Sequence, residues 1–466
     1  MSALWTSQDA AAATLGTPTR DFEVSGLSID TRTLKAGDLF VALKGESRDG
    51  HAFVLAAMEA NAGAALVSHV PEGIAPAAAP LLVVANTQRA LEDLGRAART
   101  RTNAKIIAVT GSAGKTTTKE LLRLAVGALG STSASAASYN NHWGVPLSLA
   151  LMPRTTQYGV FEIGMNHFGE IRALAGLARP HVAIVTTIAP AHLEFFGSCE
   201  AIADAKSEIF EGLLPGGSVV LPSDSPYFER LFARAKQAGV SRVLRFGEKA
   251  GSDARLLSMS DGDMMSIEAD VLGRHHSFRV GAPGAHIAHN AVAALLAVGV
   301  LGGDVANAAA ALADFAPLKG RGARFDATTR GGRVRVIDES YNANPASMRA
   351  ALALLGSAQP DKDGRRIAVL GDMLEMGPQG PAMHAALRRD IEAARVDTVF
   401  ACGQQMAALW DALPATRRGA YGATSAEIAP SLVSALHGGD IVLVKGSLGS
   451  RMAVIIDALK SRPVAG

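Results

Sequence analysis

Short apolar runs alternate with segments of helical periodicity from the start of the chain. The runs at 38–45, 63–69 and 80–86 have the length and β-branched content of strands. An alanine-rich helical segment at 52–62 lies between the first two, and 87–103 has the spacing of a helix that leads out of the unit. The pattern predicts a small N-terminal α/β domain over 1–102.

A second series of apolar runs occupies the middle of the chain, at 105–111, 158–164, 181–188 and 217–222. These runs are almost continuously hydrophobic and are separated by helical segments, which is typical of parallel strands covered on both faces. We therefore predict a central domain over 103–317, built on a mainly parallel sheet with crossover helices.

The segment 314–326, "DFAPLKGRGARFD", gathers proline, glycine and basic residues and is predicted to be a linker. After it, a third series of strands is expected at 333–340, 365–372, 397–403 and 440–446, each followed by a helix. This is the pattern of a Rossmann-like domain, over 318–466. The predicted fold class is α/β in three domains.

Composition excludes several classes of function. Of 466 residues, 48% are hydrophobic and 19% charged, and a formal net charge of +2 gives no bulk attraction to nucleic acid or anionic membranes. Cys199 and Cys402 form neither a disulfide framework nor a zinc motif. The longest apolar run, 291–303, is shorter than the roughly 20 residues that span a bilayer. With no secretory signal pattern at the N-terminus, we expect a cytoplasmic protein that binds no nucleic acid and does not insert into membranes.

The stretch "KIIAVTGSAGKTTTKE" (105–120) departs from the usual phosphate-loop spacing, because Val109 stands where the first glycine belongs and Gly111 comes two residues late. Strand, glycine turn and helix follow in the required order, and Lys115 is placed to reach phosphate oxygens. One alternative is that the glycines only permit a tight turn. The pattern favours an ATP-phosphate site made of Gly111, Ser112, Ala113, Gly114, Lys115, Thr116 and Thr117.

Three further side chains are candidates for chemistry. Glu162 stands near the end of an apolar strand, and His192 follows the next one, so both belong to the edge of the sheet where α/β proteins bind ligands. Lys206 lies in the helical segment "EAIADAKSEIF". From the residues alone, the acid could equally be solvated or paired, the histidine structural, and the lysine a solvated helix residue.

The motifs taken together resemble the Mur ligases, in that family's order and over nearly the whole chain. The shortened loop is the family's own variant. The resemblance implies a three-domain ATP-dependent ligase, with an N-terminal domain for the UDP end of the substrate, a central ATPase and a Rossmann-like domain that closes over the site. The motifs are "TGSAGKTTT", "YNNHWGVPLSL", "FEIGMNHFGEI", "AHLEFFGSCEAIADAKSEIF", "HNAVAAL", "LKGRGARF", "IDESYNANPASM", "VLGDMLEMG" and "VLVKGSLGSRM".

The resemblance also implies ATP and Mg²⁺ as cofactors and assigns roles to residues. Thr116 and Glu162 would hold one magnesium ion, His192 would help to hold a second, and Lys206 matches a lysine that is carbamylated in many Mur ligases. With Lys115, the last three form the expected catalytic set. The nucleotide contacts implied are Asn290, Arg321 (with Arg324 as a neighbouring alternative), Asp338 and Glu339, the last replacing a more usual aspartate.

The implied substrates are small molecules: UDP-N-acetylmuramoyl-tripeptide, D-alanyl-D-alanine and ATP. An amide would form through an acyl phosphate, without a protein nucleophile, and we expect a monomer. Ser28, Asp30 and Arg32 match the uridine-diphosphate contact region, and the other expected substrate contacts are Asn140, Asn141, Tyr341, Asn342 and Asn344.

Three alternatives differ in what they leave unexplained. A sister ligase that adds the third peptide residue typically carries a D-N-P-R motif, and that string does not occur here. A folylpolyglutamate synthetase would lack the UDP-type N-terminal domain. A nucleotide-gated regulator would leave the acidic, histidine and lysine set without a role. The sequence does not distinguish diaminopimelate from lysine at the third peptide position.

Overall fold

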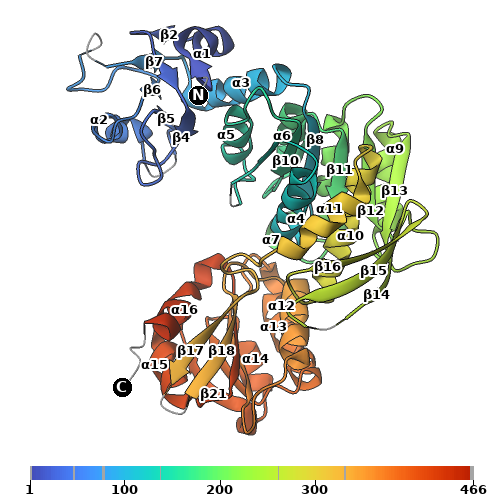
Figure 1. The fold of residues 1–466 in the computed structure, drawn as a ribbon. Helices are drawn as coiled ribbons and strands as arrows, with labels where there is room; N and C mark the ends of the chain where they lie inside the picture. Colours follow the sequence, from blue (N-terminus) through green and yellow to red (C-terminus); the bar gives the residue numbers. More distant parts are fainter. Residues whose placement is uncertain are drawn as a thin grey trace.

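The computed structural model describes residues 3–45, 48–75, 79–136, 138–260, 262–329 and 332–461. Three α/β parts, each with its own sheet, follow one another along a curved molecule (Figure 1). The predicted three-domain α/β class is confirmed. Within the described ranges, no helix has both the length and the apolar character needed to cross a membrane.

The N-terminal part is built on a five-stranded sheet in the order β2-β7-β6-β5-β4, in which only β2 is antiparallel to its neighbour. All three predicted strands are present, as β5, β6 and β7. Its elements are β1 (Trp5–Thr6), α1 (Ser7–Thr14), β2 (Thr17–Pro18), β3 (Glu23–Val24), β4 (Gly26–Ser28), β5 (Asp38–Val41), η1 (Gly50–Phe53), α2 (Val54–Glu59), β6 (Ala64–Val67), β7 (Leu81–Val83) and α3 (Thr87–Thr100).

Helix α3 ties this part to the next one. It packs against α5 (Gly144–Ala150), and the guanidinium of Arg99 donates to the carbonyls of Ala178 (2.8 Å) and Arg179 (3.0 Å) at the end of α6 (Glu170–Ala178). The indole of Trp5 donates to the carbonyl of Ala150 at 2.9 Å. The first sheet is therefore held to the central one by buried polar contacts as well as by helix packing.

The central sheet has nine strands in the order β16-β15-β14-β13-β12-β11-β8-β10-β9. The four predicted strands are present as β8, β10, β11 and β12 and are parallel. The other five strands, β9, β13 and β14 and the antiparallel β15 and β16, were not predicted. The elements are β8 (Lys105–Thr110), α4 (Lys115–Gly127), β9 (Thr132–Ala134), α5, β10 (Tyr158–Glu162), α6 (Glu170–Ala178), β11 (Val182–Val185), α7 (Leu193–Phe196), α8 (Cys199–Ser207), η2 (Glu208–Gly212), β12 (Ser218–Pro222), α9 (Phe228–Gln237), β13 (Arg242–Gly247), β14 (Ala254–Met259), β15 (Met265–Val271), β16 (Arg274–Val280), α10 (Ala285–Val300), α11 (Val305–Ala311) and η3 (Leu312–Asp314).

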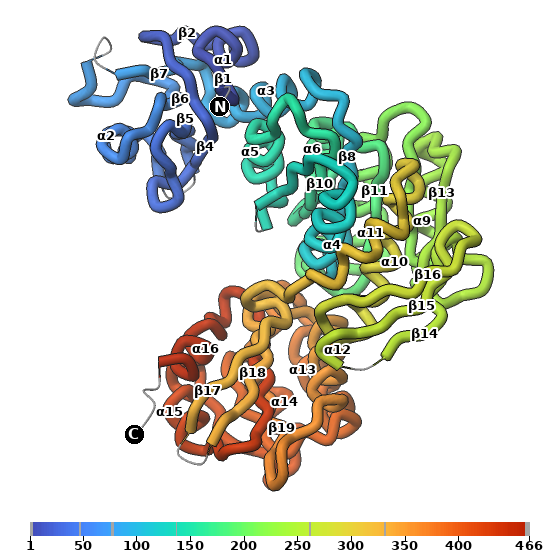
Figure 2. The backbone as a smooth tube through the Cα atoms, in the orientation of Figure 1, coloured from blue at the N-terminus to red at the C-terminus, as the bar shows by residue number. Residues whose placement is uncertain are grey.

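Helices cover both faces of this sheet. Buried residues of α4 and α10 form one core with the sheet, and those of α5, α6, α8 and α9 contribute to the other. The backbone trace shows β14, β15 and β16 extending the sheet beyond β13 (Figure 2). Asp263, between β14 and β15, forms an ion pair with Arg324 of the C-terminal part, so this extension also contacts the third sheet.

The C-terminal sheet has the order β17-β18-β22-β19-β20-β21, and all but β17 are parallel. The Rossmann-like pattern is confirmed, but residues 323–326 of the predicted linker begin β17, because Ala323 pairs with Asp338 of β18. The elements are β17 (Ala323–Thr329), β18 (Gly332–Glu339), α12 (Pro345–Ser357), β19 (Arg366–Gly371), η4 (Gly377–Gln379), α13 (Gly380–Ala393), β20 (Thr398–Cys402), α14 (Ala407–Ala412), η5 (Ala415–Arg417), β21 (Arg418–Gly422), α15 (Ser425–Ala435), β22 (Ile441–Lys445), η6 (Leu448–Ser450) and α16 (Ala453–Lys460).

Candidate active site

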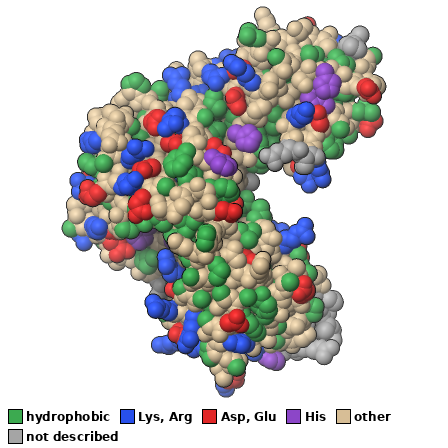
Figure 3. Space-filling view, turned by 180° about the vertical axis from the view of Figure 1, so that it is seen from behind, with side chains coloured by type: hydrophobic (Ala, Val, Ile, Leu, Met, Phe, Trp, Pro, Cys, Tyr) green, Lys and Arg blue, Asp and Glu red, His purple; other side chains and the backbone are tan. Residues whose placement is uncertain are grey.

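A cleft of about 1040 Å³ is lined by residues of both the central and the C-terminal parts. The turn between β8 and α4, the ends of β10 and β11, and the loops that follow β18, β19 and β22 all contribute to its wall. The space-filling view shows the molecule hollowed on the side where the N- and C-terminal parts face each other (Figure 3). The carboxyl edges of two parallel sheets therefore meet at one site, as α/β proteins require for ligand binding.

The phosphate-type loop is fixed against strand β11. Gly111 (φ 149°) and Gly114 (φ 81°) have backbone conformations that favour glycine. A Cβ atom on Gly111 would lie 1.8 Å from the hydroxyl of Thr186, and that hydroxyl donates to the carbonyl of Ala113 at 2.6 Å. The glycine at 111 is therefore required by the close approach of β11, and it packs behind the loop, whereas residues 112–117 line the cleft.

Lys115 begins α4 and is half-buried. Its Nζ donates to the carbonyl of Gly111 at 2.8 Å, so the ammonium lies over the loop. Burial lowers the pKa of Lys115, opposed by the negative charge of Glu162 and reinforced by the positive charge of Arg321. The helix N-terminus and this cation together make the loop an anion-binding site.

Glu162, at the end of β10, is the buried anion of the site, with 1% of its surface exposed. Its two carboxylate oxygens accept hydrogen bonds of 2.7 Å from the hydroxyl of Thr116 and the amide of Asn140. No lysine or arginine described in the structure lies within ion-pair distance of it. A buried carboxylate that lacks a basic partner is costly unless a cation neutralises it, and the oxygens of Glu162 and Thr116 are of the kind that Mg²⁺ prefers.

Lys206 lies on α8 and lines the same cleft, with only 2% of its surface exposed. The alternative of a solvated helix lysine is therefore wrong. Among the described residues its amine has no hydrogen-bond or ion-pair partner. Burial, and then the charge of Lys115, lower the pKa of Lys206 well below its ordinary value. A bare ammonium is therefore disfavoured at this position.

His192 meets a residue that the sequence analysis did not single out. Its Nδ1 lies 2.5 Å from Oε2 of Glu375, in the loop after β19. This contact holds the pKa of Glu375 below its usual range. The backbone amide of Glu194 also donates to the carbonyl of Glu375 at 3.1 Å. Glu375 belongs to the motif "VLGDMLEMG", so the signal was present, but its partner lies in another domain and cannot be found from local spacing.

Two of the expected nucleotide contacts flank the loop. Asn290 is buried on α10, and its amide would be 3.0 Å from a Cβ atom placed on Gly114. Arg321 donates to the hydroxyl of Ser138 at 2.8 Å, and its guanidinium lies 4.1 Å from the centre of the Tyr341 ring. Arg324, the neighbouring alternative, pairs with Asp263 and does not line the cleft. The geometry favours Arg321.

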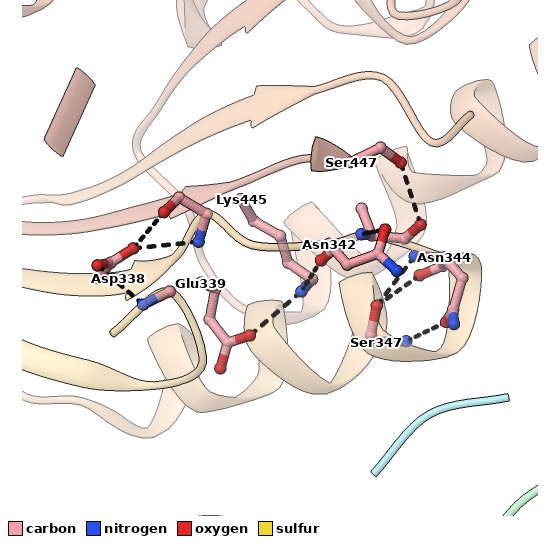
Figure 4. Close-up of polar contacts among 10 residues, drawn as sticks. Asp338, Glu339, Asn342, Asn344, Ser347, Lys445 and Ser447 are labelled. Atoms are coloured by element: carbon pink, nitrogen blue, oxygen red, sulfur yellow. Dashed lines mark hydrogen bonds and ion pairs between the residues drawn. The ribbon is translucent and has the colours of Figure 1, made fainter. Parts of the chain in front are cut away.

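The expected acidic pair is divided between two environments (Figure 4). Asp338 is 1% exposed and accepts hydrogen bonds from the amides of Gly320 (3.0 Å) and Ser340 (3.1 Å), and it does not line the cleft. Glu339 lines the cleft and accepts a 3.2 Å hydrogen bond from the buried ammonium of Lys445. Asp338 holds the backbone in place, whereas Glu339 is available to a ligand.

The expected substrate residues fall into two groups. Asn344 caps α12 through the amide of Ser347 (2.9 Å), and its own amide donates to the carbonyl of Ser112 at 3.2 Å, which joins the C-terminal part to the loop. The cleft group is Asn140, Asn141, Tyr341, Asn342 and Asn344.

The other group lies in the N-terminal part and does not line the cleft. The hydroxyl of Ser28 donates to the carbonyl of Asp30 at 2.9 Å. Arg32 is exposed and donates to both carboxylate oxygens of Asp30, an interaction that lowers the pKa of Asp30 to about 2. Asp30 and Arg32 form a separate polar surface on the first domain, and Ser28 is buried beneath it.

Three domain models of the Mur ligase family match successive parts of the chain. They are described as the Mur ligase family catalytic domain (residues 23–102), the Mur ligase middle domain (109–298) and the Mur ligase glutamate ligase domain (323–448). Among similar proteins are the UDP-N-acetylmuramoyl-tripeptide–D-alanyl-D-alanine ligases of Rickettsia prowazekii, 31% identical over 92% of this chain and 94% of that protein, and of Escherichia coli, 33% identical over 94% of each.

Solved structures agree with these relatives. MurF from Acinetobacter baumannii is 31% identical, with a TM-score of 0.83 over 98% of this chain and 99% of that one. MurF from Thermotoga maritima, solved in complex with ADP, is 24% identical and has the same fold, with a TM-score of 0.76 over 94% of this chain and 97% of that one.

Proposed function

The chain belongs to the Mur ligase family, and from this premise we propose that it joins D-alanyl-D-alanine to UDP-N-acetylmuramoyl-tripeptide at the expense of ATP, in the synthesis of peptidoglycan precursors. The observation that carries the proposal is the similarity, over nearly the full length, to relatives named for this activity. The phosphate-type loop, which faces a cleft between two domains, is the proposed binding site for the phosphates of ATP. Residues 1–102, 103–317 and 318–466 are the proposed domains.

We propose that residues 111–117 bind the phosphates of ATP, and that Asn290, Arg321 and Glu339 surround the rest of the nucleotide. Asp338 acts on the nucleotide only through the backbone that it holds. Mg²⁺ fits the residues present, because Glu162 is a buried carboxylate without a basic partner and Thr116 offers a second oxygen. His192 would contribute to a second ion. When bound, the metal supplies positive charge to the phosphate oxygens.

The proposed carbamate on Lys206 follows from its surroundings. A neutral amine can take up CO₂ to give a carbamate with release of one proton, and the buried position beside Lys115 favours the neutral amine. The carbamate would turn a group that repels cations into a pair of hard oxygen ligands. It would also place a second negative charge near Lys115, in addition to that of Glu162.

The reaction proceeds by two displacements on the substrates. An oxygen of the tripeptide carboxylate attacks the γ-phosphorus of ATP, and ADP leaves with the electrons of the broken bond. The amine of D-alanyl-D-alanine then attacks the acyl phosphate, phosphate leaves, and the amine loses a proton. Lys115 neutralises charge on the phosphoryl group that is transferred.

Substrate recognition is divided between two surfaces in this proposal. Ser28, Asp30 and Arg32 bind the uridine-diphosphate end, and the asparagine-rich segment of the cleft (Asn140, Asn141, Asn342 and Asn344, with Tyr341) contacts the peptide end. The first surface lies on the N-terminal part and the second lies between the other two parts, which follow along a curved molecule (Figure 1), so one substrate must be long enough to reach both.

The test measures ADP release with UDP-N-acetylmuramoyl-tripeptide, with and without D-alanyl-D-alanine, and identifies the product by mass. We expect ADP and one new amide only when both substrates are present. Parallel assays with diaminopimelate- and lysine-containing tripeptides identify the third residue. Product formation with a single amino acid in place of the dipeptide, and none with D-alanyl-D-alanine, would assign the chain to a different step of the family.

A further inference from the structure

One contact joins the proposed second cation site to the C-terminal domain. His192 precedes α7 with φ 56°, and Glu375 lies in the loop between β19 and η4 with φ 62°. Neither is glycine, so both backbones occupy a region that side chains disfavour, and such conformations persist where the surroundings impose them. The two strained residues meet each other, with Nδ1 of His192 2.5 Å from Oε2 of Glu375.

The contact determines which nitrogen of His192 remains available. Nδ1 is buried and lies within ion-pair distance of Oε2 of Glu375, but this contact does not have hydrogen-bond geometry; Nε2 has no hydrogen bond among the described residues and is not a buried atom. The side chain retains 27% of its exposure and lines the cleft. The ring therefore turns Nδ1 to the C-terminal domain and leaves Nε2 accessible from the cleft.

Simple docking of the two domains does not require this contact. Asn344 already reaches the carbonyl of Ser112, and Arg321 reaches Ser138. Arg324 also pairs with Asp263. A carboxylate held against one nitrogen of an imidazole restricts the ring orientation, and a hydrogen bond formed there would also set the tautomer and make the opposite nitrogen a better metal ligand.

We propose that Glu375 is a positioning residue, which orients His192 through Nδ1 so that Nε2 binds a divalent cation once the C-terminal domain is docked. The inference rests on the proposed function, which assigns His192 to the second ion. A residue of another domain thus orients a ligand of the cation site, and domain docking and metal affinity are coupled.

The experiment measures Mn²⁺ binding without turnover, from the electron paramagnetic resonance of free Mn²⁺, in the presence of a non-hydrolysable ATP analogue. The variants are Glu375→Ala, Glu375→Gly, His192→Ala and the double variant His192→Ala/Glu375→Ala. Glu194→Gln is the matched control, because Glu194 is an exposed carboxylate on the same surface. We expect Glu375→Ala to weaken one class of Mn²⁺ sites by about 10- to 100-fold and the control to bind as the wild type does.

The double variant separates positioning from general structure. If Glu375 acts through His192, the double variant binds Mn²⁺ no more weakly than His192→Ala alone. An additional loss in the double variant would overturn the proposal, as would unchanged binding in Glu375→Ala. Glycine fits φ 62° without strain, so Glu375→Gly must show the same loss, and wild-type affinity in that variant would assign the alanine effect to the backbone.

The ligation assay is performed on the same wild-type preparation. A wild type that shows the coupling but does not ligate D-alanyl-D-alanine refutes the substrate assignment alone. A wild type that ligates but shows no coupling between Glu375 and His192 refutes the positioning role alone.

Discussion

Replacing Lys206 with alanine removes three buried methylenes and the amine. The lost burial costs about 2 kcal/mol, at about 0.8 kcal/mol per methylene. Part of this cost is offset, because burial disfavours the charged form of the amine, as the lowered pKa of Lys206 indicates. We therefore expect the alanine variant to fold, with a change in unfolding free energy of no more than about 2 kcal/mol. Lys206→Met retains the chain and should be at least as stable as the wild type.

Turnover should respond very differently from stability. If the carbamate of Lys206 binds a metal ion, both variants should lose about 10²-fold or more in kcat, comparable with the loss of one group that stabilises the transition state. Acetate or formate at high concentration should restore part of the activity of Lys206→Ala, because the vacated space admits a carboxylate. The same acids should not rescue Lys206→Met, whose side chain fills that space.

The assay is ADP release under saturating substrates, with ethylamine as the control for rescue by size alone. Carbon-13 NMR of protein equilibrated with labelled bicarbonate provides an independent signal for the carbamate, which Lys206→Met should lack. Full turnover of either variant would refute the metal-ligand role. Rescue by ethylamine and not by acetate would show that the cationic lysine is the active form.

Four other outcomes are expected. Lys115→Ala should lose about 10²- to 10³-fold in kcat, and near-normal turnover in a folded variant would contradict the phosphate role. Arg32→Ala should raise KM for the sugar nucleotide alone, whereas equal losses for ATP would indicate a defect in folding or closure. Gly111→Ala should destabilise the folded protein by about 1–3 kcal/mol, because the added Cβ would meet Thr186. Gly127→Ala is the control and should not destabilise the protein, because a Cβ there has nothing within 4 Å. The denaturation midpoints of the two variants make the comparison. In CO₂-free buffer, the lowered pKa of Lys206 means that the unfolded state binds more protons than the folded state, so the free energy of unfolding should rise with pH up to the unfolded pKa near 10.5. The contribution of this group is at most about 1.4 kcal/mol per pH unit. Urea titrations at several pH values should show that Lys206→Met loses this part of the slope.

The hydrophobic pattern and the glycine positions predicted the helices and strands whose signals lie within a short stretch of sequence. The strands that end at Thr110 and Glu162 and the helix that begins at Lys115 were all predicted, because apolar runs, glycines and helical spacing are local signals. Strands β14, β15 and β16 were missed because their alternating, partly exposed pattern carries less apolar signal than a buried parallel strand.

Long-range features of the site could not be predicted in the same way. The burial of Lys206 depends on which elements cover α8, and helical spacing does not specify them. The contact of Glu375 with His192, and the backbone role of Asp338, depend on how two domains are oriented. Motif similarity identified the segments that contain these residues, but only the structure separates Glu339, which faces the cleft, from Asp338, which does not.

The hydrogen bonds of Asp338 have a mechanical consequence. Its carboxylate receives the amide of Gly320, its carbonyl receives the amide of Gly322, and the carbonyl of Gly320 receives the amide of Tyr341. The backbone on both sides of Arg321 is thus hydrogen-bonded to the C-terminal sheet, so we expect the hinge between the two domains to lie before Arg321, near 315–319. A rotation of the C-terminal domain about this hinge would move the guanidinium away from Ser138 and the neighbouring loop. The nucleotide contact proposed for Arg321 therefore changes together with the angle between the two domains. Amide exchange should be slower at Gly320 and Gly322 than at Lys319.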